Sequence, residues 1–392
     1  MNDQQSTQDA SAPAAQAAPE KLPVSVITGF LGSGKTTLLR HLLVQDWMAD
    51  TAVVINEFGE IGLDHDLLEA ANEDTLLLSS GCLCCTVRGD LIDTLRRLYK
   101  QRERGEITRF RRLVIETTGL ADPAPILHTL IGDPLLSAFY RLDGVVTTID
   151  AVNGMDQLDR QTEAVKQAAV ADRLLVTKTD LVTEAALEAL ERRLRRLNPA
   201  APIHHVTQGR IEAQQLFNAG LYNPETKSMD VQGWLREEAY RGDHHEHAHD
   251  HDHGHDHQDH AHHHGHEHGH GHEQAHHDHD HAHNDLNRHD DHIRAFCLTH
   301  DQPLDWDRFV NWIEMLTATQ GANLLRLKGI LNVDGEDKPV AIHGVQHLFH
   351  PPVVLPAWPS DDRRSRLVFI TRDLDQKVLG KSLTDFQKMP VS

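Results

Sequence analysis

Short apolar runs alternate with amphipathic segments through the first half of the chain. Residues 22–30 (LPVSVITGF) predict a buried strand, and residues 35–44 (KTTLLRHLLV) predict a helix directly after it. The same pattern continues with an amphipathic helix at 90–102 and further strands at 51–59, 75–80, 110–119, 142–152 and 171–181. Because strands that alternate with helices are joined by right-handed crossovers, the pattern predicts an α/β domain with a mostly parallel sheet flanked by helices.

The pattern changes twice in the second half of the chain. The first domain is expected to span 21–240, after a disordered tail at 1–20. Residues 241–292 are almost wholly His, Asp, Glu, Gly and Ala, so they predict a flexible linker that cannot form a core. A small α+β domain is then predicted over 293–392, from a helix at 306–321 and strands at 293–299, 323–333, 338–349 and 364–373.

Charge and composition narrow the range of functions. The 392 residues carry a formal net charge of −21, and more than half of this excess lies in the His-rich stretch. An acidic balance argues against general binding to nucleic acid or to anionic membranes, since both need a basic face. No secretory signal and no run of about 20 apolar residues is visible, so a cytoplasmic location is expected.

A glycine-rich loop follows the first predicted strand. Residues 29–36 read GFLGSGKT and match the phosphate-binding pattern G-x-x-x-x-G-K-[ST] between a strand and a helix. Gly29, Gly32 and Gly34 let backbone amides converge on phosphates at a helix N-terminus. Lys35 would reach the β and γ phosphates, and the Thr36 hydroxyl would bind Mg²⁺. The chain is therefore predicted to be a P-loop NTPase.

Residues at the end of a later predicted strand indicate which nucleotide base is bound. Residues 177–180 (TKTD) resemble the guanine signature N-K-x-D, with Thr in place of the first Asn. In this pattern the Asp180 carboxylate would accept hydrogen bonds from two donors of guanine that adenine lacks as a pair, while the Lys178 stem packs on the base. The alternative interpretation is an ordinary polar turn that ends a strand. The position of the motif favours GTP over ATP.

A carboxylate ends the strand predicted at 110–119. Glu116 lies in the sequence Glu-Thr-Thr-Gly and suits Mg²⁺ or water positioning, so it joins Lys35 and Thr36 as a candidate catalytic residue. Gly119 suits a loop that senses the γ-phosphate, and residues 56–60 are a second candidate switch. No clear catalytic glutamine or arginine finger is visible, so slow intrinsic hydrolysis is expected.

Three of the four cysteines fall within one tetrapeptide. Cys82, Cys84 and Cys85 follow an apolar strand and are predicted to lie in a turn before a helix. Thiolates are soft ligands that suit Zn²⁺, and a carboxylate such as Glu57, or a water, would complete a tetrahedral site. Packing of buried cysteines and a vicinal redox switch are the competing interpretations. A thiolate zinc site is the favoured one.

The His-rich stretch contains 23 of the 32 histidines. Imidazole binds Zn²⁺, Ni²⁺, Cu²⁺ and Co²⁺, so the stretch predicts a metal reservoir that holds several ions exchangeably, although a plain spacer is the alternative. Cys297 is expected to lie in the core of the C-terminal domain. His300, His343, His347 and His350 are expected to be structural or surface residues rather than ligands.

The chain resembles the CobW-type family of metal-handling P-loop GTPases in five ordered motifs: GFLGSGKTTLL, NEFGEIGLD, GCLCC, ETTGLADP and TKTDL. The segments LLRLKGILNV and AIHGVQHLF resemble the C-terminal domain of that family, so the likeness covers roughly residues 22–372 without the His run. The resemblance implies a GTP-dependent metallochaperone with Mg²⁺ and Zn²⁺ as cofactors. It also implies that residues from Gly32 and Ser33 to Thr37 bind phosphates and Mg²⁺. The expected partners are GTP, zinc and an unidentified client metalloprotein, with a homodimer left open.

Three other functions compete with a zinc chaperone. Cobalt or nickel insertion is the nearest, because the imidazoles do not choose between the metals. Passive storage by the His run would make the GTPase incidental. A small-molecule kinase would use the same phosphate loop but would need an acceptor pocket with a lid, which the sequence does not show. The leading hypothesis is a switch in which GTP and Mg²⁺ tighten the thiolate site and hydrolysis loosens it.

Overall fold

The first domain is built on a nine-stranded sheet with the order β3-β4-β5-β2-β6-β1-β7-β8-β9. This computed structural model describes residues 21–56, 68–72, 75–78, 83–86, 90–217 and 292–389. The seven strands from β5 to β9 in this order are parallel, and β3 and β4 extend the sheet as antiparallel strands. The strand bounds are β1 Leu22–Gly29, β2 Thr51–Asn56, β3 Leu68–Asn72, β4 Thr75–Leu78, β5 Leu83–Thr86, β6 Arg112–Thr117, β7 Tyr140–Asp150, β8 Arg173–Thr177 and β9 Ile203–Val206.

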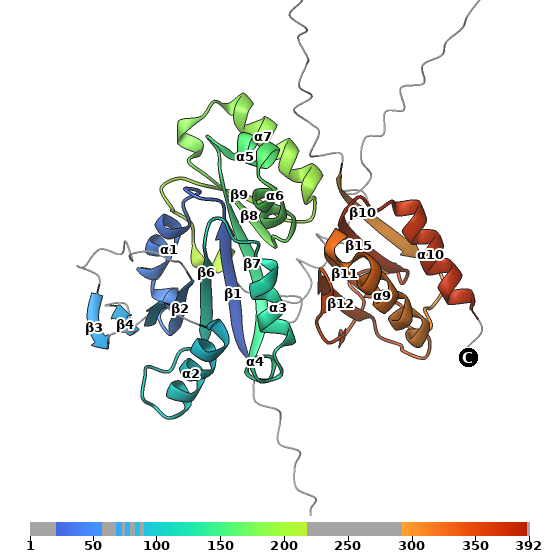
Figure 1. Ribbon diagram of the computed structural model, residues 1–392, viewed down its shortest axis with the longest axis horizontal. Coiled ribbons are helices and arrows are strands. Elements are labelled where there is room, and N and C mark those ends of the chain that lie inside the picture. Colours follow the sequence, from blue (N-terminus) through green and yellow to red (C-terminus); the bar gives the residue numbers. More distant parts are fainter. Residues whose placement is uncertain are drawn as a thin grey trace, which may run out of the picture.

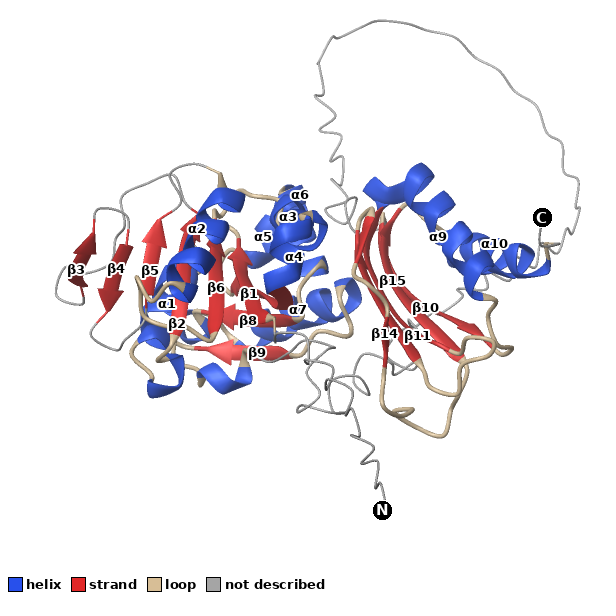
Figure 2. Ribbon diagram, turned by 90° about the horizontal axis from the view of Figure 1, so that it is seen from below, coloured by secondary structure: helices blue, strands red, loops and turns tan. Residues whose placement is uncertain are grey.

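Helices cover both faces of this sheet (Figures 1 and 2). Three of them begin where the sequence supplies a capping side chain: Asp90 accepts from the Ile92 amide, Asp133 from the Leu135 and Leu136 amides, and Thr183 from the Ala186 amide. The strands are apolar on both sides because each face packs against helices. The helix bounds are α1 Lys35–Leu43, α2 Leu91–Glu103, α3 Ala124–Gly132, α4 Pro134–Phe139, α5 Gly154–Arg160, α6 Thr162–Ala169 and α7 Glu184–Leu197.

The C-terminal domain is an antiparallel sheet with two helices on one face. The sheet order is β10-β15-β11-β12-β13, with β14 paired to β12. Figure 2 shows α9 and α10 on the outer face, while the other face is turned toward the first domain. Trp312 and Phe369 are fully buried between helices and sheet. The bounds are β10 Ile293–His300, α9 Trp306–Gln320, β11 Leu324–Leu331, β12 Val340–Val345, β13 Leu348–Phe349, β14 Val353–Val354, β15 Ser365–Arg372 and α10 Gln376–Lys388.

The predicted fold class is confirmed: a mostly parallel sheet flanked by helices is followed by a small α+β domain. One local expectation is wrong. Cys84 and Cys85 do not lie in a turn, because residues 83–86 form β5, whose backbone pairs with β2 on one side and β4 on the other. Two neighbouring strands satisfy the backbone hydrogen bonds of this segment, which favours an extended conformation. Helix α2 begins only at Leu91.

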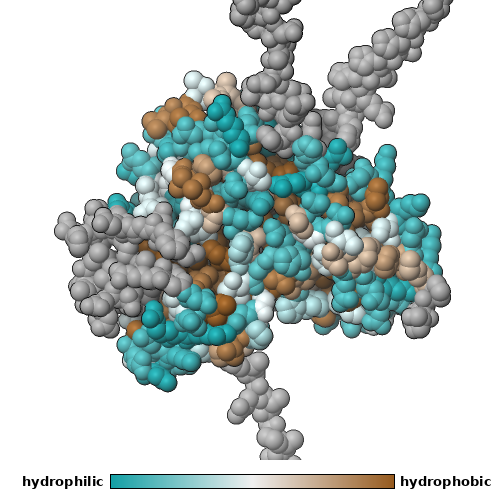
Figure 3. All heavy atoms as spheres, viewed as in Figure 1, coloured by the Kyte–Doolittle hydropathy of each residue, from teal (hydrophilic) through white to brown (hydrophobic). Residues whose placement is uncertain are grey.

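The two domains pack directly against each other. His128 of α3 donates from Nε2 to the carbonyl of Val345 in β12, at 3.1 Å. Leu325 and Ile370 of the C-terminal sheet join an apolar cluster formed by the first domain. The visible surface is mostly hydrophilic with separate apolar patches (Figure 3). Among the described residues, no helix has the length and apolar character needed to cross a bilayer.

Acid is expected to destabilise the C-terminal domain through His350. Burial lowers its pKa to about 4, and the stacked neighbour His343, with ring centroids 4.9 Å apart, also has a lowered pKa. An unfolded histidine titrates near 6.5, so between about pH 6.5 and 4 the unfolded chain binds a proton that the folded chain does not. Stability is thus fully present above pH 6.5 and is lost as the pH falls, by on the order of 2 kcal/mol at pH 5 for His350 alone.

The measurement is denaturant unfolding between pH 7.5 and 5, followed at the C-terminal domain. The His350→Gln variant should lose less stability over this range than the unmodified chain. A His350→Gln curve that runs parallel to that of the unmodified chain would contradict the assignment.

Candidate functional site

The phosphate loop joins the end of β1 to the start of α1. Its three glycines have positive φ angles: +141° at Gly29, +70° at Gly32 and +93° at Gly34. These are conformations that side chains with a Cβ rarely adopt. At Gly29 there is also no room, because a Cβ would lie 2.3 Å from the Thr148 hydroxyl oxygen. The loop therefore has the backbone shape that turns amides toward an anion at a helix N-terminus.

Lys35 places a buried positive charge inside this loop. Its Nζ donates to the carbonyl oxygens of Gly29 at 2.9 Å and Phe30 at 3.1 Å, and the residue is 6% exposed. The amine is held at the N-terminal end of α1, where the helix dipole also favours negative charge. Both features attract the same ligand, a phosphate group.

A hydroxyl and a carboxylate meet beside the loop. The Thr36 Oγ1 donates to Glu116 Oε1 at 3.0 Å, although 80 residues separate the two in sequence. Glu116 lies near the end of β6, which pairs in parallel with β1, and it is 1% exposed. Hard oxygen donors of this kind suit Mg²⁺ bound together with phosphate oxygens. The predicted residues Thr36 and Glu116 are thus in direct contact.

The segment after β6 packs closely on the phosphate loop. A Cβ on Gly119 would lie 2.7 Å from the backbone nitrogen of Leu31, so only glycine fits there. The fully buried Gln167 of α6 donates from Nε2 to the carbonyls of Gly119 at 3.2 Å and Ala121 at 3.0 Å. These contacts hold the segment between the phosphate loop and α6.

Residues 177–180, which we call the base motif, contact the phosphate loop through their first residue, Thr177. Thr177 Oγ1 donates to the Ser33 carbonyl at 2.8 Å, a contact from the position where the guanine signature has Asn. Lys178 follows in a left-handed conformation with φ +57°, and its Nζ donates to Asp150 Oδ2 at 2.7 Å. Asp180 lies exposed beyond it. The motif thus forms a loop beside the phosphate loop rather than a distant turn.

Sequence reasoning missed Asp150 as part of this site. Its carboxylate also accepts from the Val152 amide and from Asn153 Nδ2, both at 2.9 Å. Burial raises its pKa, but these bonds and Lys178 outweigh burial and hold the pKa below its usual value. The sequence did contain a signal for Asp150, because an acidic residue ends an apolar strand there. Glu116, which was predicted, lies one residue before the end of its strand.

A second missed segment is the loop after β9. Thr207 Oγ1 lies 3.3 Å from Thr179 Oγ1 in the base motif. Gly209, with φ +75°, lies so close to α1 that a Cβ would be 2.8 Å from the Thr37 carbonyl oxygen. This loop therefore borders both the base motif and the phosphate loop. The short strand before it, with two histidines among four residues, gave no apolar signal.

The predicted metal ligands are only partly within the described residues. Cys82 and Glu57 lie outside them. Cys84 and Cys85 lie in β5 and pair through the backbone with Val53 and Val54 of β2. Strand β2 pairs in turn with β6, placing Asn56 opposite Thr117. Among the described side chains, no group of three or more His, Cys, Asp or Glu is arranged to hold a metal ion.

Comparisons with known proteins agree with this architecture. Residues 23–205 match the family described as CobW/HypB/UreG, nucleotide-binding domain. Residues 293–387 match the family described as cobalamin synthesis protein cobW C-terminal domain. The two matches together cover both domains and most of the chain.

One relative matches nearly the whole chain, and another matches about half of it. The Escherichia coli protein named zinc chaperone YjiA is 32% identical over 367 residues, which cover 94% of this chain and 99% of that protein. The Schizosaccharomyces pombe zinc-regulated GTPase metalloprotein activator 1 is 36% identical over 218 residues, covering 53% and 52% of the two chains.

Two solved structures of the Escherichia coli protein are similar throughout. The crystal structure of the Zn(II)-bound YjiA GTPase is 30% identical, with a TM-score of 0.67, and the match covers 94% of this chain and all of that one. A Zn(II)-bound triple variant, with one glutamate and two consecutive cysteines replaced by alanine, gives a TM-score of 0.68. The predicted resemblance is confirmed, and the chain belongs to the CobW family of P-loop nucleotide-binding proteins.

Proposed function

We propose that this protein is a zinc chaperone that uses its nucleotide state to control the transfer of Zn²⁺ to a client metalloprotein. The observation that carries the proposal is the strand order β5-β2-β6-β1. It places the cysteine strand, a candidate switch strand, the strand of Glu116 and the strand of the phosphate loop side by side. A change at the γ-phosphate then has only two strands to cross to reach the thiols.

The nucleotide chemistry follows from the contacts of the site. The chain is a GTPase in which the loop amides and Lys35 hold the phosphates. Thr36 and Glu116 would hold Mg²⁺, which neutralises charge on the β and γ phosphates. Asp180 would select guanine. The Lys178 stem would pack on the base, and the Lys178 amine is held by Asp150. Glu116 would also orient the attacking water.

Zinc is the cargo that the donor set favours. Cys82, Cys84 and Cys85 would supply thiolates, and Glu57 an oxygen. The names of the relatives in Escherichia coli and Schizosaccharomyces pombe both refer to zinc. Because the triple variant of the Escherichia coli protein is also Zn(II)-bound, the presence of zinc alone is a weak test. The decisive quantity is the dependence of zinc affinity on nucleotide.

Zinc affinity is expected to rise at least about tenfold when a non-hydrolysable GTP analogue and Mg²⁺ are bound, which corresponds to about 1.4 kcal/mol. Competition with a chelator measures the zinc affinity of the full chain and of a variant that lacks residues 243–292. The deletion removes the zinc that the histidines of this stretch would bind. Linkage requires that zinc tighten binding of the analogue by the same factor.

The double variant Cys84→Ser, Cys85→Ser should lose this nucleotide-dependent part of the affinity. Cys297→Ala is the matched control, because Cys297 is a buried thiol of the C-terminal domain. Equal zinc affinity with and without nucleotide in the unmodified chain would refute the switch. Running the same competition with Co²⁺ and Ni²⁺ decides whether zinc is the preferred cargo.

A further inference from the structure

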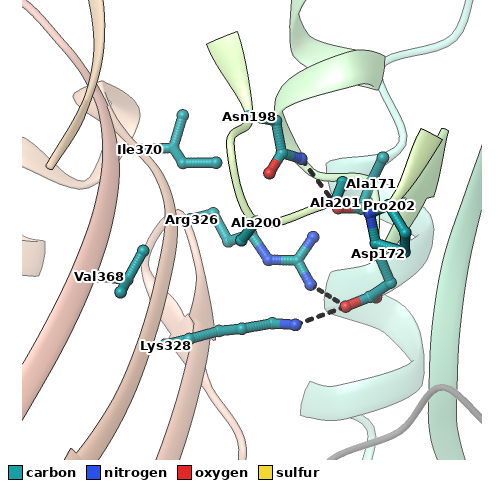
Figure 4. A pocket seen from close by; sticks show the side chains of 10 residues that line it. All are labelled: Ala171, Asp172, Asn198, Ala200, Ala201, Pro202, Arg326, Lys328, Val368 and Ile370. Atoms are coloured by element: carbon teal, nitrogen blue, oxygen red, sulfur yellow. Dashed lines mark hydrogen bonds and ion pairs between the residues drawn. The ribbon is translucent and has the colours of Figure 1, made fainter. Parts of the chain in front are cut away.

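One short turn connects α6 to β8, and the C-terminal domain binds it directly. Arg326 of β11 donates to the carbonyl of Val170 and to Asp172 Oδ1. Lys328, two residues along the same strand, donates to Asp172 Oδ1 at 2.6 Å. Figure 4 shows both side chains reaching from the C-terminal sheet to this carboxylate. We call residues 170–172 the joint.

The contact at the joint is buried between the domains. The side chains of Arg326, Lys328 and Asp172 are 5%, 12% and 7% exposed. Burial alone raises the pKa of Asp172, but the two positive charges outweigh it and hold the pKa well below its usual value. The adjacent cavity of about 30 Å³ has room for little more than a water molecule, so it is a packed junction rather than a ligand pocket.

Asp172 is also fixed within the first domain. It exchanges two hydrogen bonds with Val145 of β7: its amide donates to the Val145 carbonyl at 2.7 Å, and its Oδ2 accepts from the Val145 amide at 3.0 Å. One carboxylate therefore links β7, β8 and the C-terminal sheet. A charge buried in this way is costly unless its partners stay in place.

On one side of the joint, α6 leads to the segment that packs on the phosphate loop. Gln167 holds the carbonyls of Gly119 and Ala121, and Lys166 donates to Asp122 at 2.7 Å. Gln167 is three residues before Val170, whose carbonyl accepts from Arg326. A shift of the joint would therefore move the side chains that hold this segment.

On the other side of the joint, β8 leads to the base motif. The strand is five residues long, from Arg173 to Thr177, and it lies between β7 and β9. Strands within a sheet are stiff along their length, so the position of the first residue influences that of the last. At the far end Thr177 contacts the phosphate loop and is followed by Lys178.

We propose that Arg326 and Lys328 of the C-terminal domain are positioning residues for the nucleotide site, acting through the joint on both α6 and β8. The hydrogen bonds described for them are made to Val170 and Asp172 of the joint. Their role is to hold the joint so that the base motif and the γ-phosphate segment keep their relative positions. By linkage, nucleotide binding must then stabilise the docking of the C-terminal domain. The inference rests on the proposed guanine site at Lys178 and Asp180.

The first test compares affinities for GTP and inosine triphosphate in the full chain. Inosine lacks the 2-amino group that Asp180 would accept from, so the ratio of the two affinities reports the position of the base motif. Lys328→Met should weaken GTP binding about tenfold, within the usual range of coupling between sites, and should lower the ratio. Lys328→Arg should restore both. Arg294→Met, which removes an exposed charge from β10, should change neither.

Two results would overturn the proposal: unchanged GTP affinity in a folded Lys328→Met variant, or equal losses for GTP and inosine triphosphate. If the unmodified chain shows no preference for GTP over inosine triphosphate, the guanine assignment fails first and the positioning role fails with it. Zinc is absent from this experiment, so its outcome is independent of the zinc switch.

A second measurement needs no substitution. Hydrogen exchange of the peptide that contains β11 is followed in the unmodified chain with and without a non-hydrolysable GTP analogue. Slower exchange with the analogue is expected, because nucleotide binding stabilises the docked C-terminal domain. Identical exchange of β11 in both states, while β1 is protected by the analogue, would contradict the coupling.

Discussion

GTP hydrolysis by the Lys35→Ala variant is expected to fall at least about 100-fold below that of the unmodified chain. The amine is buried inside the phosphate loop and held by two carbonyls of that loop. No other side chain described in the loop can replace a positive charge at this point. The loss should appear in both nucleotide affinity and turnover, because the amine would contact the ground state and the transition state.

Phosphate release under single-turnover conditions, at saturating GTP, separates these two effects. Lys100→Ala is the matched control, since Lys100 is an exposed lysine of α2 in the same domain. Circular dichroism verifies that the variant is folded, because the amine also satisfies the carbonyls of Gly29 and Phe30. Hydrolysis within a factor of about three of the unmodified rate would remove Lys35 from the catalytic site.

The Asp180→Asn variant is expected to bind GTP at least about 100-fold more weakly and to gain affinity for xanthosine triphosphate. The carboxylate would accept from N1 and from the 2-amino group of guanine, and bonds to a charged group contribute about 1.5 to 3 kcal/mol each. An amide offers one acceptor and one donor. Xanthine, with a carbonyl oxygen at position 2, complements that pair where guanine does not.

Equilibrium titration with fluorescent analogues of GTP and xanthosine triphosphate measures the affinity of each variant for both nucleotides. Glu188→Gln, on the exposed face of α7, is the control for loss of one surface carboxylate. Loss of GTP binding without any gain for xanthosine triphosphate would indicate that Asp180 stabilises the loop rather than reading the base.

Sequence reasoning succeeds where a local pattern dictates local structure. The run from Leu22 to Thr36 contains an apolar strand, three glycines and a helix start in contiguous residues, so its shape follows from nearest neighbours. The same holds for the strand that carries Glu116 and for the strand that ends just before Lys178. Because parallel strands end at one edge of a sheet, the order of motifs also indicated that these residues converge.

The features that escaped prediction depend on residues far apart in the chain. Asp172 and Arg326 are separated by 154 positions, and neither lies in a recognisable motif. The cysteine segment was predicted as a turn because its neighbours β2 and β4 are not visible as partners in a sequence. Helix α3 follows Pro123 and contains Pro125, which obscured its start although proline is tolerated in a first turn.

The hydrogen bond from Thr177 to the Ser33 carbonyl has a consequence for how quickly nucleotide leaves. It joins the base motif to the phosphate loop, so neither can move outward alone without losing that bond. Such a bond contributes about 0.5 to 1.5 kcal/mol, so its loss would add a barrier of that size to the opening of either segment alone. If both segments hold the nucleotide as proposed, a disturbance of one would therefore also loosen the grip of the other.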